Sequence, residues 1–351
     1  MPTMVPNSLL SGSQEPLPPD SIIFGVTLAM RQVQEKLAKV AQAQVPVLIG
    51  GESGTGKEII ARLLHLRSPW SAGPFVKVNC PAIPGTLLES ELFGYEKGAF
   101  TGAYGSKPGR VELAHRGSLF MDEISELDPA LQAKLLQLLQ DGQFCRIGSQ
   151  EDTRVEVRFI CATNRDLSHE IETGTFRQDL FYRINVVNIQ LPPLRERVKD
   201  IPTLVDYFLG VYNRSFNRRV RPFSSSILNM LERYHWPGNI RELENMMKRY
   251  VILEAEEAIG SELLQREQNP FHGELITESN VSLKRITRQA VRDLERKIIL
   301  KTLQDHNWNR KQAARVLEIS YRALLYKIRD AGLVSYRTRK AGATIAETAA
   351  D

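Results

Sequence analysis

The sequence predicts an α/β fold with a parallel sheet, followed by segments that are helical only. Three short apolar runs, at 45–49, 118–121 and 157–163, indicate buried strands. Two stretches between them, at 58–66 and 130–140, carry apolar residues at helical spacing. Because strands that alternate with helices favour a parallel sheet, we expect helices on both faces of that sheet.

Beyond the sheet the strand signals end. Residues 204–254 are predicted to be helical, the polar stretch around 266–275 indicates a linker, and residues 283–333 are helical and basic. The chain therefore divides into a disordered lead-in at 1–20, an α/β subdomain at 21–191, a helical subdomain at 192–260, a linker at 261–282, a second helical domain at 283–334 and a flexible tail at 335–351.

Length and composition indicate a globular protein of two or three domains. The 351 residues are 42% hydrophobic and 25% charged. No run approaches eighteen apolar residues, so we expect no membrane span, and residues 1–20 lack the basic start and apolar block of a signal peptide. Cys80, Cys145 and Cys161 have no metal-ligand spacing. We expect reduced, buried thiols and a cytoplasmic protein.

The charge is concentrated at the carboxyl-terminal end. Residues 282–340 contain sixteen Lys or Arg and five Asp or Glu, a balance of +11, whereas the whole chain carries +5 and the remainder therefore −6. Such asymmetry indicates a basic segment that meets a polyanion such as DNA, although a solvated helical surface gives the same count.

A phosphate-binding loop follows the first predicted strand. "GESGTGKE" (51–58) lies between the strand at 45–49 and the helix at 58–66, which is the context a P-loop requires. Backbone N–H groups there wrap phosphates and Lys57 reaches the β and γ oxygens. The residues predicted to bind are Gly51, Glu52, Ser53, Gly54, Thr55, Gly56, Lys57 and Glu58. Glu58 stands where the general pattern has a hydroxyl that holds Mg²⁺, so the metal needs another ligand.

Two further strand ends supply acidic and polar groups. "SLFMDE" brings Asp122 to the end of a buried strand, where its carboxylate can hold Mg²⁺. Glu123 beside it can polarise a water molecule for attack on the γ-phosphate. Asn164, at the end of the strand at 157–163, can hydrogen-bond the γ-phosphate. These groups predict hydrolysis of ATP with Mg²⁺.

A glycine-flanked loop and a helix-turn-helix complete the pattern. The loop "GAFTGA" consists of Gly98, Ala99, Phe100, Thr101, Gly102 and Ala103, and it exposes an aromatic and a hydroxyl residue at a tip. In "NWNRKQAARVLEISYRALLYKIRDAGL" (307–333), Ala313, Ala314 and Leu317 line a first helix, and Leu324, Leu325 and Ile328 line a second. Residues predicted to contact DNA are Ser320, Tyr321, Arg322, Tyr326, Lys327 and Arg329. An apolar stripe at Ile286, Ala290, Leu294 and Ile298 serves either dimerisation or core packing.

Together these motifs resemble the AAA+ central domain and Fis-type helix-turn-helix of bacterial sigma-54-dependent transcription activators. The likeness rests on "GESGTGKE", "ELFGYEKGAFTGA", "SLFMDE", "ATNRDL", "FRQDLFYRI", "LPPLRERVKDI" and "WPGNIREL" and covers about 22–259. It implies an AAA+ P-loop domain with a helical lid, and glutamate at position 58 is usual in that family. One departure is Glu318, where the family often has glycine in the turn.

The resemblance also implies roles for residues that the chain alone does not reveal. Asn79 matches an asparagine that restrains the catalytic glutamate, here Glu123. Arg177 and Arg183 match arginines that reach the ATP of a neighbouring subunit, which implies a ring, usually a hexamer. Arg241 matches a lid arginine that senses nucleotide, and Ile23 to Gly25 match the segment beside adenine.

The function implied is ATP-driven remodelling of sigma-54 RNA polymerase holoenzyme by a protein bound as a dimer to upstream double-stranded DNA. Gly98 to Ala103 are then the contact with sigma-54. With about twenty residues before Ile22, we expect no regulatory domain; a separate regulatory protein, the expression level, or truncation of a longer relative would explain its absence. Two alternatives are a DNA-binding regulator that acts without sigma-54 and a generic AAA+ remodeller, and the intact "GAFTGA" disfavours the first of them.

Overall fold

The computed structural model describes residues 16–268, 299, 302–303, 306, 309–317 and 319–330. The chain forms two compact units, Met1–Pro270 and Phe271–Asp351, and each is described by itself.

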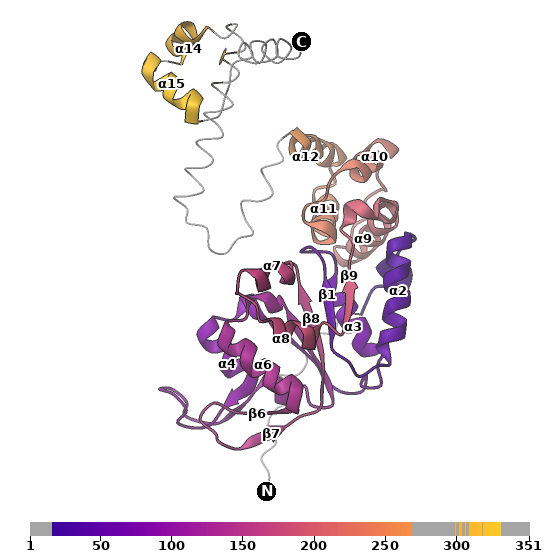
Figure 1. Cartoon of the computed structure of the whole chain (residues 1–351). Helices are drawn as coiled ribbons and strands as arrows, with labels where there is room; N and C mark the ends of the chain where they lie inside the picture. Colours follow the sequence, from indigo (N-terminus) through magenta and orange to yellow (C-terminus); the bar gives the residue numbers. More distant parts are fainter. Residues whose placement is uncertain are drawn as a thin grey trace, which may run out of the picture. The chain divides into compact units, whose positions relative to one another are not determined.

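The first unit is built on a five-stranded parallel sheet (Figure 1). Its strands, in the spatial order β2-β5-β8-β1-β9, are Phe75–Asn79, Gly117–Asp122, Val157–Thr163, Val47–Gly50 and Val187–Gln190. The three predicted strands are confirmed as β1, β5 and β8. The two edge strands β2 and β9 were not predicted, because exposed polar residues alternate in them with apolar ones and interrupt the apolar run.

Helices cover both faces of this sheet, as predicted. The chain enters through α1 (Asp20–Ile23) and α2 (Leu28–Ala41), and α3 (Lys57–Leu66) follows β1. Side chains alternate between the faces, so that Ile49 packs with Leu37 and Leu64 of α2 and α3. Leu48 packs instead in the core that contains Leu135. That opposite core is covered by α4 (Gly85–Phe93), α6 (Pro129–Asp141) and α8 (Gln178–Ile184). The short helices α5 (Arg110–Leu113) and α7 (Leu167–Glu172) complete the α/β part.

Two small antiparallel hairpins project from the sheet. β3 (Gly94–Tyr95) pairs with β4 (Lys107–Pro108) and carries the loop between them, and β6 (Gln143–Cys145) pairs with β7 (Asp152–Arg154). A parallel bridge between Tyr95 and Ile147 joins the two hairpins. The loop that contains Gly98–Ala103 therefore stands on a base of four short strands.

A helical lid follows β9. It consists of α9 (Ile201–Ser215), α10 (Ser225–Arg233), α11 (Asn239–Leu253) and α12 (Glu256–Gln268), so that helix continues beyond residue 260. The lid has its own core around Trp236, which is fully buried and donates a hydrogen bond from Nε1 to the Leu231 carbonyl at 2.8 Å. Among the helices of the described segments, none is long and apolar enough to cross a membrane.

The second unit contains α14 (Arg310–Val316) and α15 (Tyr321–Asp330). Ala313, Ala314, Leu324 and Ile328 are buried together with Leu303, which is the packing predicted for a helix pair. The Ser320 hydroxyl accepts a hydrogen bond from the Ala323 amide at 3.2 Å and so caps α15. Ile286, Ala290, Leu294 and Ile298 lie outside the described residues, as do Glu318 and the side chains of Tyr326 and Arg329.

The prediction of three buried thiols was wrong for one of them. Cys80 and Cys161 are buried, and burial raises the pKa of the Cys80 thiol to about 12. Cys145 is exposed on the β6–β7 hairpin. A short strand on a projecting hairpin has one face in solvent, which the residue type alone did not indicate.

Candidate functional site

The P-loop connects the end of β1 to the first turn of α3. Gly51, Gly54 and Gly56 have φ angles of 149°, 77° and 98°, a region that favours glycine. Lys57 begins α3 and is 7% exposed, and its Nζ donates hydrogen bonds to the carbonyls of Gly51 at 2.8 Å and Glu52 at 3.3 Å. The ammonium group is therefore held in the mouth of the loop, where the free N–H groups of the helix terminus also point.

The acidic pair lies directly against this lysine. Glu123 Oε1 is 3.4 Å from Lys57 Nζ, and Glu123 Oε2 accepts a hydrogen bond from the Asn164 backbone amide at 2.9 Å. Glu123 has a left-handed backbone with φ of 56°, which turns its side chain back towards the loop. Lys57, Glu123 and Asn164 were predicted from separate motifs. They are brought together at the carboxyl ends of the neighbouring strands β5, β8 and β1.

Asp122 occupies the last position of β5, with its Cα in register with that of Asn79 on β2. Burial, and then the neighbouring Glu123 carboxylate, raise the pKa of Asp122. Asn79 is exposed, and the partners of the Glu123 side chain within the described residues are Lys57 and the Asn164 amide rather than Asn79.

The lid is bound to the P-loop by a set of polar contacts that we call the lid clasp, formed by Glu52, Arg195, Asn239 and Arg241. Asn239 Nδ2 donates to Glu52 Oε2 at 3.1 Å and to the Ser53 carbonyl at 3.0 Å. Its Oδ1 accepts from the Leu194 amide at 2.8 Å, so a fully buried amide side chain is satisfied on both sides. Arg241 Nη1 donates to Ser53 Oγ at 3.0 Å.

Arg195 completes the clasp. Its guanidinium donates to both oxygens of the Glu52 carboxylate, at 2.8 and 2.5 Å, and holds the pKa of that carboxyl below its usual value. Gly54 lies under the turn before α11, and a Cβ added to it would come within 2.4 Å of the Gly238 carbonyl oxygen. The P-loop and the lid are therefore in direct contact at the glycine.

The segment after β9 also holds the turn between α1 and α2 in place. Asp200 is buried and accepts hydrogen bonds from the Val26 amide at 2.7 Å and from Thr27 Oγ1 at 2.9 Å. Arg197 is buried too, donates from Nη2 to the Thr55 carbonyl at 3.2 Å, and has its pKa lowered to about 10 by burial. Sequence reasoning missed Arg195, Arg197, Asp200 and Asn239 as site residues, although each lies in a motif that carried the resemblance.

A cavity of about 420 Å³ opens beside the P-loop, between the sheet and the lid. Its lining is largely apolar and includes Ile22, Ile23, Leu191, Phe208 and Ile240, together with Thr55 and Gly56 of the loop. The size and the apolar walls suit a planar base, with the phosphate-binding amides at one end. The predicted residue Ile23 lines this cavity, and Gly25 lies against Asp200.

The residues present fit Mg²⁺–ATP. A magnesium ion in such sites is usually held by one or two carboxylates together with phosphate oxygens and water, and Asp122 supplies a carboxylate at the strand edge next to Lys57 and Glu123. Within residues 16–268 and the described part of the second unit, no group of three or more His, Cys, Asp or Glu side chains is arranged around a common point.

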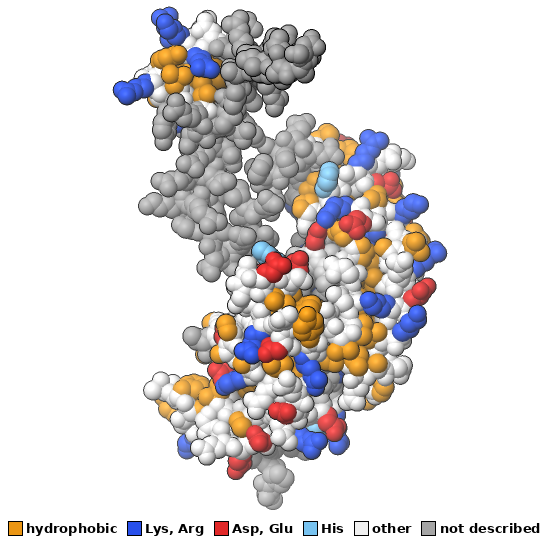
Figure 2. Space-filling view, viewed as in Figure 1, with side chains coloured by type: hydrophobic (Ala, Val, Ile, Leu, Met, Phe, Trp, Pro, Cys, Tyr) orange, Lys and Arg blue, Asp and Glu red, His pale blue; other side chains and the backbone are white. Residues whose placement is uncertain are grey.

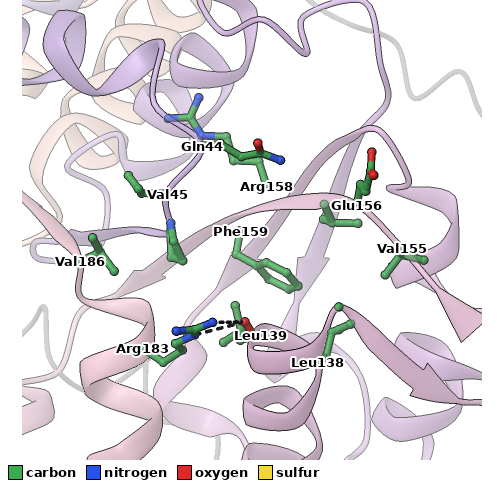
Figure 3. A pocket seen from close by; sticks show the side chains of 13 residues that line it. Gln44, Val45, Leu138, Leu139, Val155, Glu156, Arg158, Phe159, Arg183 and Val186 are labelled. Carbon is green, nitrogen blue, oxygen red and sulfur yellow. Dashed lines mark hydrogen bonds between the residues drawn. The ribbon is translucent and has the colours of Figure 1, made fainter. Parts of the chain in front are cut away.

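Arg183 lies at the other end of the sheet. Its Nε and Nη2 donate to the Leu139 carbonyl at 3.1 and 2.8 Å, and Figure 3 shows it across a cleft of about 450 Å³ from Arg158 and Phe159. That cleft is also lined by Val45 and Pro46, which precede β1, whereas the P-loop follows β1. Arg183 therefore faces away from the phosphates of its own chain.

Arg177 is the N-cap residue that precedes α8, and it pairs on the surface with Asp179, with Nη2 to Oδ2 at 2.6 Å. Its backbone amide donates to Gln132 Oε1 of α6 at 2.8 Å, which fixes the start of the helix. Among the described contacts, neither Arg177 nor Arg183 bonds to a residue of the P-loop.

The GAFTGA loop (Gly98–Ala103) is closed by two backbone hydrogen bonds, from the Gly98 amide to the Ala103 carbonyl and from the Ala103 amide to the Phe100 carbonyl. The Phe100 ring lies edge-on to Tyr95, with centroids 4.9 Å apart, and remains 43% exposed. Thr101 is exposed at the tip.

The glycines of this hairpin fall into two groups. Cβ atoms added to Gly98 or Gly102 would meet nothing within 4 Å, although both residues have positive φ. Cβ atoms added to Gly94 or Gly109 at the base would meet backbone at 2.5 and 2.3 Å. The base is thus packed tightly and the tip is open, so the tip glycines serve backbone conformation rather than packing.

Arg146 holds the two hairpins together at that base. It pairs with Glu96 through Nη1 at 2.7 Å and with Glu112 through Nη2 at 2.6 Å, and both carboxylates raise its pKa. The Glu96 amide donates to the Ile147 carbonyl at 3.0 Å. Sequence reasoning did not identify this arginine.

In the second unit the structure describes the side chains of four of the six residues predicted to contact DNA. Ser320, Tyr321 and Arg322 are exposed at the start of α15, and Lys327 is partly exposed. Figure 2 shows basic side chains that protrude around an apolar centre in the described part of this unit. An exposed, basic helix start is suited to enter a DNA groove.

Comparison with known proteins gives three family matches along the chain. Residues 23–190 match the sigma-54 interaction domain, residues 195–281 an AAA+ ATPase lid domain, and residues 290–330 the Fis family of bacterial regulatory proteins.

Several relatives match over most of this chain. The response regulator protein PilR of Pseudomonas aeruginosa is 40% identical over 91% of this chain and 72% of its own length. The regulatory protein AtoC of Escherichia coli is 44% identical over 87% of this chain. A crystal structure of NtrX from Brucella abortus in complex with ATP is 33% identical, with a TM-score of 0.64 over 88% of this chain and 69% of that one. The chain spans 66% of AtoC and 58% of the Nif-specific regulatory protein of Azotobacter vinelandii.

The close approach of Gly54 to the Gly238 carbonyl gives a direct test of whether the lid is held against the P-loop. Gly54→Ala is expected to lower the free energy of unfolding by about 2–5 kcal/mol, because a left-handed backbone at a non-glycine residue costs about 1–2 kcal/mol and overpacking against the Gly238 carbonyl about 1–3 kcal/mol. Urea denaturation measures the change. The control is Gly210→Ala on α9, where an added Cβ meets nothing within 4 Å and stability should stay equal or rise. Equal stability of the two variants would mean that the lid is not held against the loop.

Proposed function

The chain belongs to the sigma-54-dependent AAA+ transcriptional regulators with a Fis-type helix-turn-helix, and from this membership we propose that it is an ATP-hydrolysing activator that remodels sigma-54 RNA polymerase holoenzyme. One observation carries the proposal: the GAFTGA loop is intact and open at its tip, on a tightly packed base, in the same unit as the P-loop. A loop built in this way can be displaced as a whole and still present Phe100 and Thr101.

The site residues support hydrolysis of ATP with Mg²⁺. Lys57 and the amides at the start of α3 bind the β- and γ-phosphates, and Asp122 provides the carboxylate for the metal, which neutralises charge on the phosphates when bound. Glu123, held between Lys57 and the Asn164 amide, is placed to orient a water molecule and to accept its proton.

The chain path links this site to the loop. Asn79 ends β2 beside Asp122, and the residues that follow it form a 3₁₀ turn, Cys80–Ala82, and then α4, which leads directly into β3 and the loop. We infer that Asn79 senses changes at Glu123 and that α4 transmits them to the GAFTGA loop. Two observations support this proposed route: the register of Asn79 with Asp122, and the direct chain connection from Asn79 through α4 to β3.

Catalysis across a subunit boundary is the role we propose for Arg177 and Arg183. A guanidinium group that faces away from its own P-loop, as Arg183 does, can neutralise phosphoryl charge only in another subunit. Such head-to-tail contacts close into rings, and we propose a hexamer. The second unit would then bind upstream double-stranded DNA as a dimer.

Thr101→Ala should separate the two steps of the proposed function. The side chain is exposed at the loop tip and is distant in the chain from the phosphate site, so we expect ATP turnover within about twofold of wild type and loss of promoter opening. The measurements are phosphate release and open-complex formation with sigma-54 holoenzyme. Lys57→Ala is the matched control and should abolish both. If turnover fell together with opening in Thr101→Ala, the hydroxyl would instead hold the loop in shape.

Arg322→Ala tests how the second unit meets DNA. If the exposed guanidinium contacts a base edge, the variant should bind its specific site more weakly by about 1–3 kcal/mol while its binding to random DNA changes less. Titration of both DNAs at one fixed salt concentration gives the two losses. An equal loss on the two would assign Arg322 to a phosphate.

A further inference from the structure

A second lysine stands beside the phosphate site, on the edge strand β2. Val76 and Val78 pack into the core on the α4–α6 face of the sheet, so Lys77 between them points to the other face, towards α3. There its Nζ lies 2.5 Å from Glu58 Oε2 in the first turn of α3. The two side chains are 37% and 45% exposed.

The partner of this lysine holds a special place in the loop. Glu58 directly follows Lys57, at the position where the general P-loop has a hydroxyl group for Mg²⁺. It puts a third carboxylate at the phosphate end of the sheet, in addition to Asp122 and Glu123. Lys77 and Asp122 share a face, because Asn79, two positions after Lys77, is in register with Asp122.

We propose that Lys77 is a positioning residue of the nucleotide site, which neutralises Glu58 and so allows this carboxylate to stand beside bound Mg²⁺–ATP. The inference rests on the proposed ATP binding. Without Lys77, the carboxylate of Glu58 would be unpaired. It would then repel the phosphate oxygens and weaken the attraction of Lys57 for them. At separations of roughly 5–10 Å in a partly solvated site, one such charge is worth about a three- to tenfold change in affinity.

The test compares nucleotide affinity in a cycle of four full-length chains: wild type, Lys77→Ala, Glu58→Gln and the double variant. Dissociation constants for a slowly hydrolysed fluorescent ATP analogue are measured with Mg²⁺, by a binding signal that needs no turnover. The control is Lys134→Ala, which removes the lysine of an exposed ion pair with Glu89, between α6 and α4 and outside the P-loop.

We expect Lys77→Ala to raise the dissociation constant about three- to tenfold and Lys134→Ala to leave it unchanged. In the Glu58→Gln background, loss of Lys77 should change the affinity much less than in the wild-type background, because the carboxylate that Lys77 pairs with is gone. A Lys77→Ala chain that binds as tightly as wild type overturns the inference, and so does a loss of affinity that persists in the double variant. A wild-type chain that binds no nucleotide would contradict the proposed function itself.

Discussion

The contact between the first turn of α11 and the P-loop is the constraint on which the rest of the first unit depends. Gly54 has no room for a side chain beneath the Gly238 carbonyl, and the buried Asn239 amide bonds to the loop and to the segment after β9. Loss of these hydrogen-bond partners would destabilise the folded state by about 1–3 kcal/mol, because the Asn239 amide would stay buried without them. The turn before α11 is therefore held in the position in which the Asn239 side chain makes all of these hydrogen bonds. The lid and the loop therefore wall a single cavity, whose lining comes from both.

That constraint ties the position of the lid to the P-loop. Arg241 and Arg195 reach Ser53 and Glu52 of the P-loop, so side chains from outside the α/β sheet contribute contacts at this loop. On the other side of the sheet, β2 and α4 lead from the acidic edge to the GAFTGA loop. We propose that binding of nucleotide at the P-loop acts through these two connections, on the lid and on the GAFTGA loop.

The sequence predicted what depends on local pattern and order. Continuous apolar runs located β1, β5 and β8, and the P-loop with its acidic pair followed from glycine spacing and strand ends. The edge strands alternate in polarity and were missed. Of the lid clasp, Glu52 and Arg241 were predicted as nucleotide-binding residues, but Arg195 and Asn239 were missed, because Glu52 and Asn239 are distant in the chain and neither residue type reveals its partner. Asn79, Arg177 and Arg183 received roles only through resemblance, since their proposed partners form in another state or another subunit.

The most direct measurement is open-complex formation at a sigma-54-dependent promoter, with purified full-length chain, sigma-54 RNA polymerase holoenzyme and ATP. An activator of the proposed kind opens the promoter only when ATP is hydrolysed and does nothing with a non-hydrolysable analogue. A chain that hydrolyses ATP at a normal rate, binds its DNA, and yet never opens such a promoter would contradict the proposal that the GAFTGA loop couples hydrolysis to sigma-54.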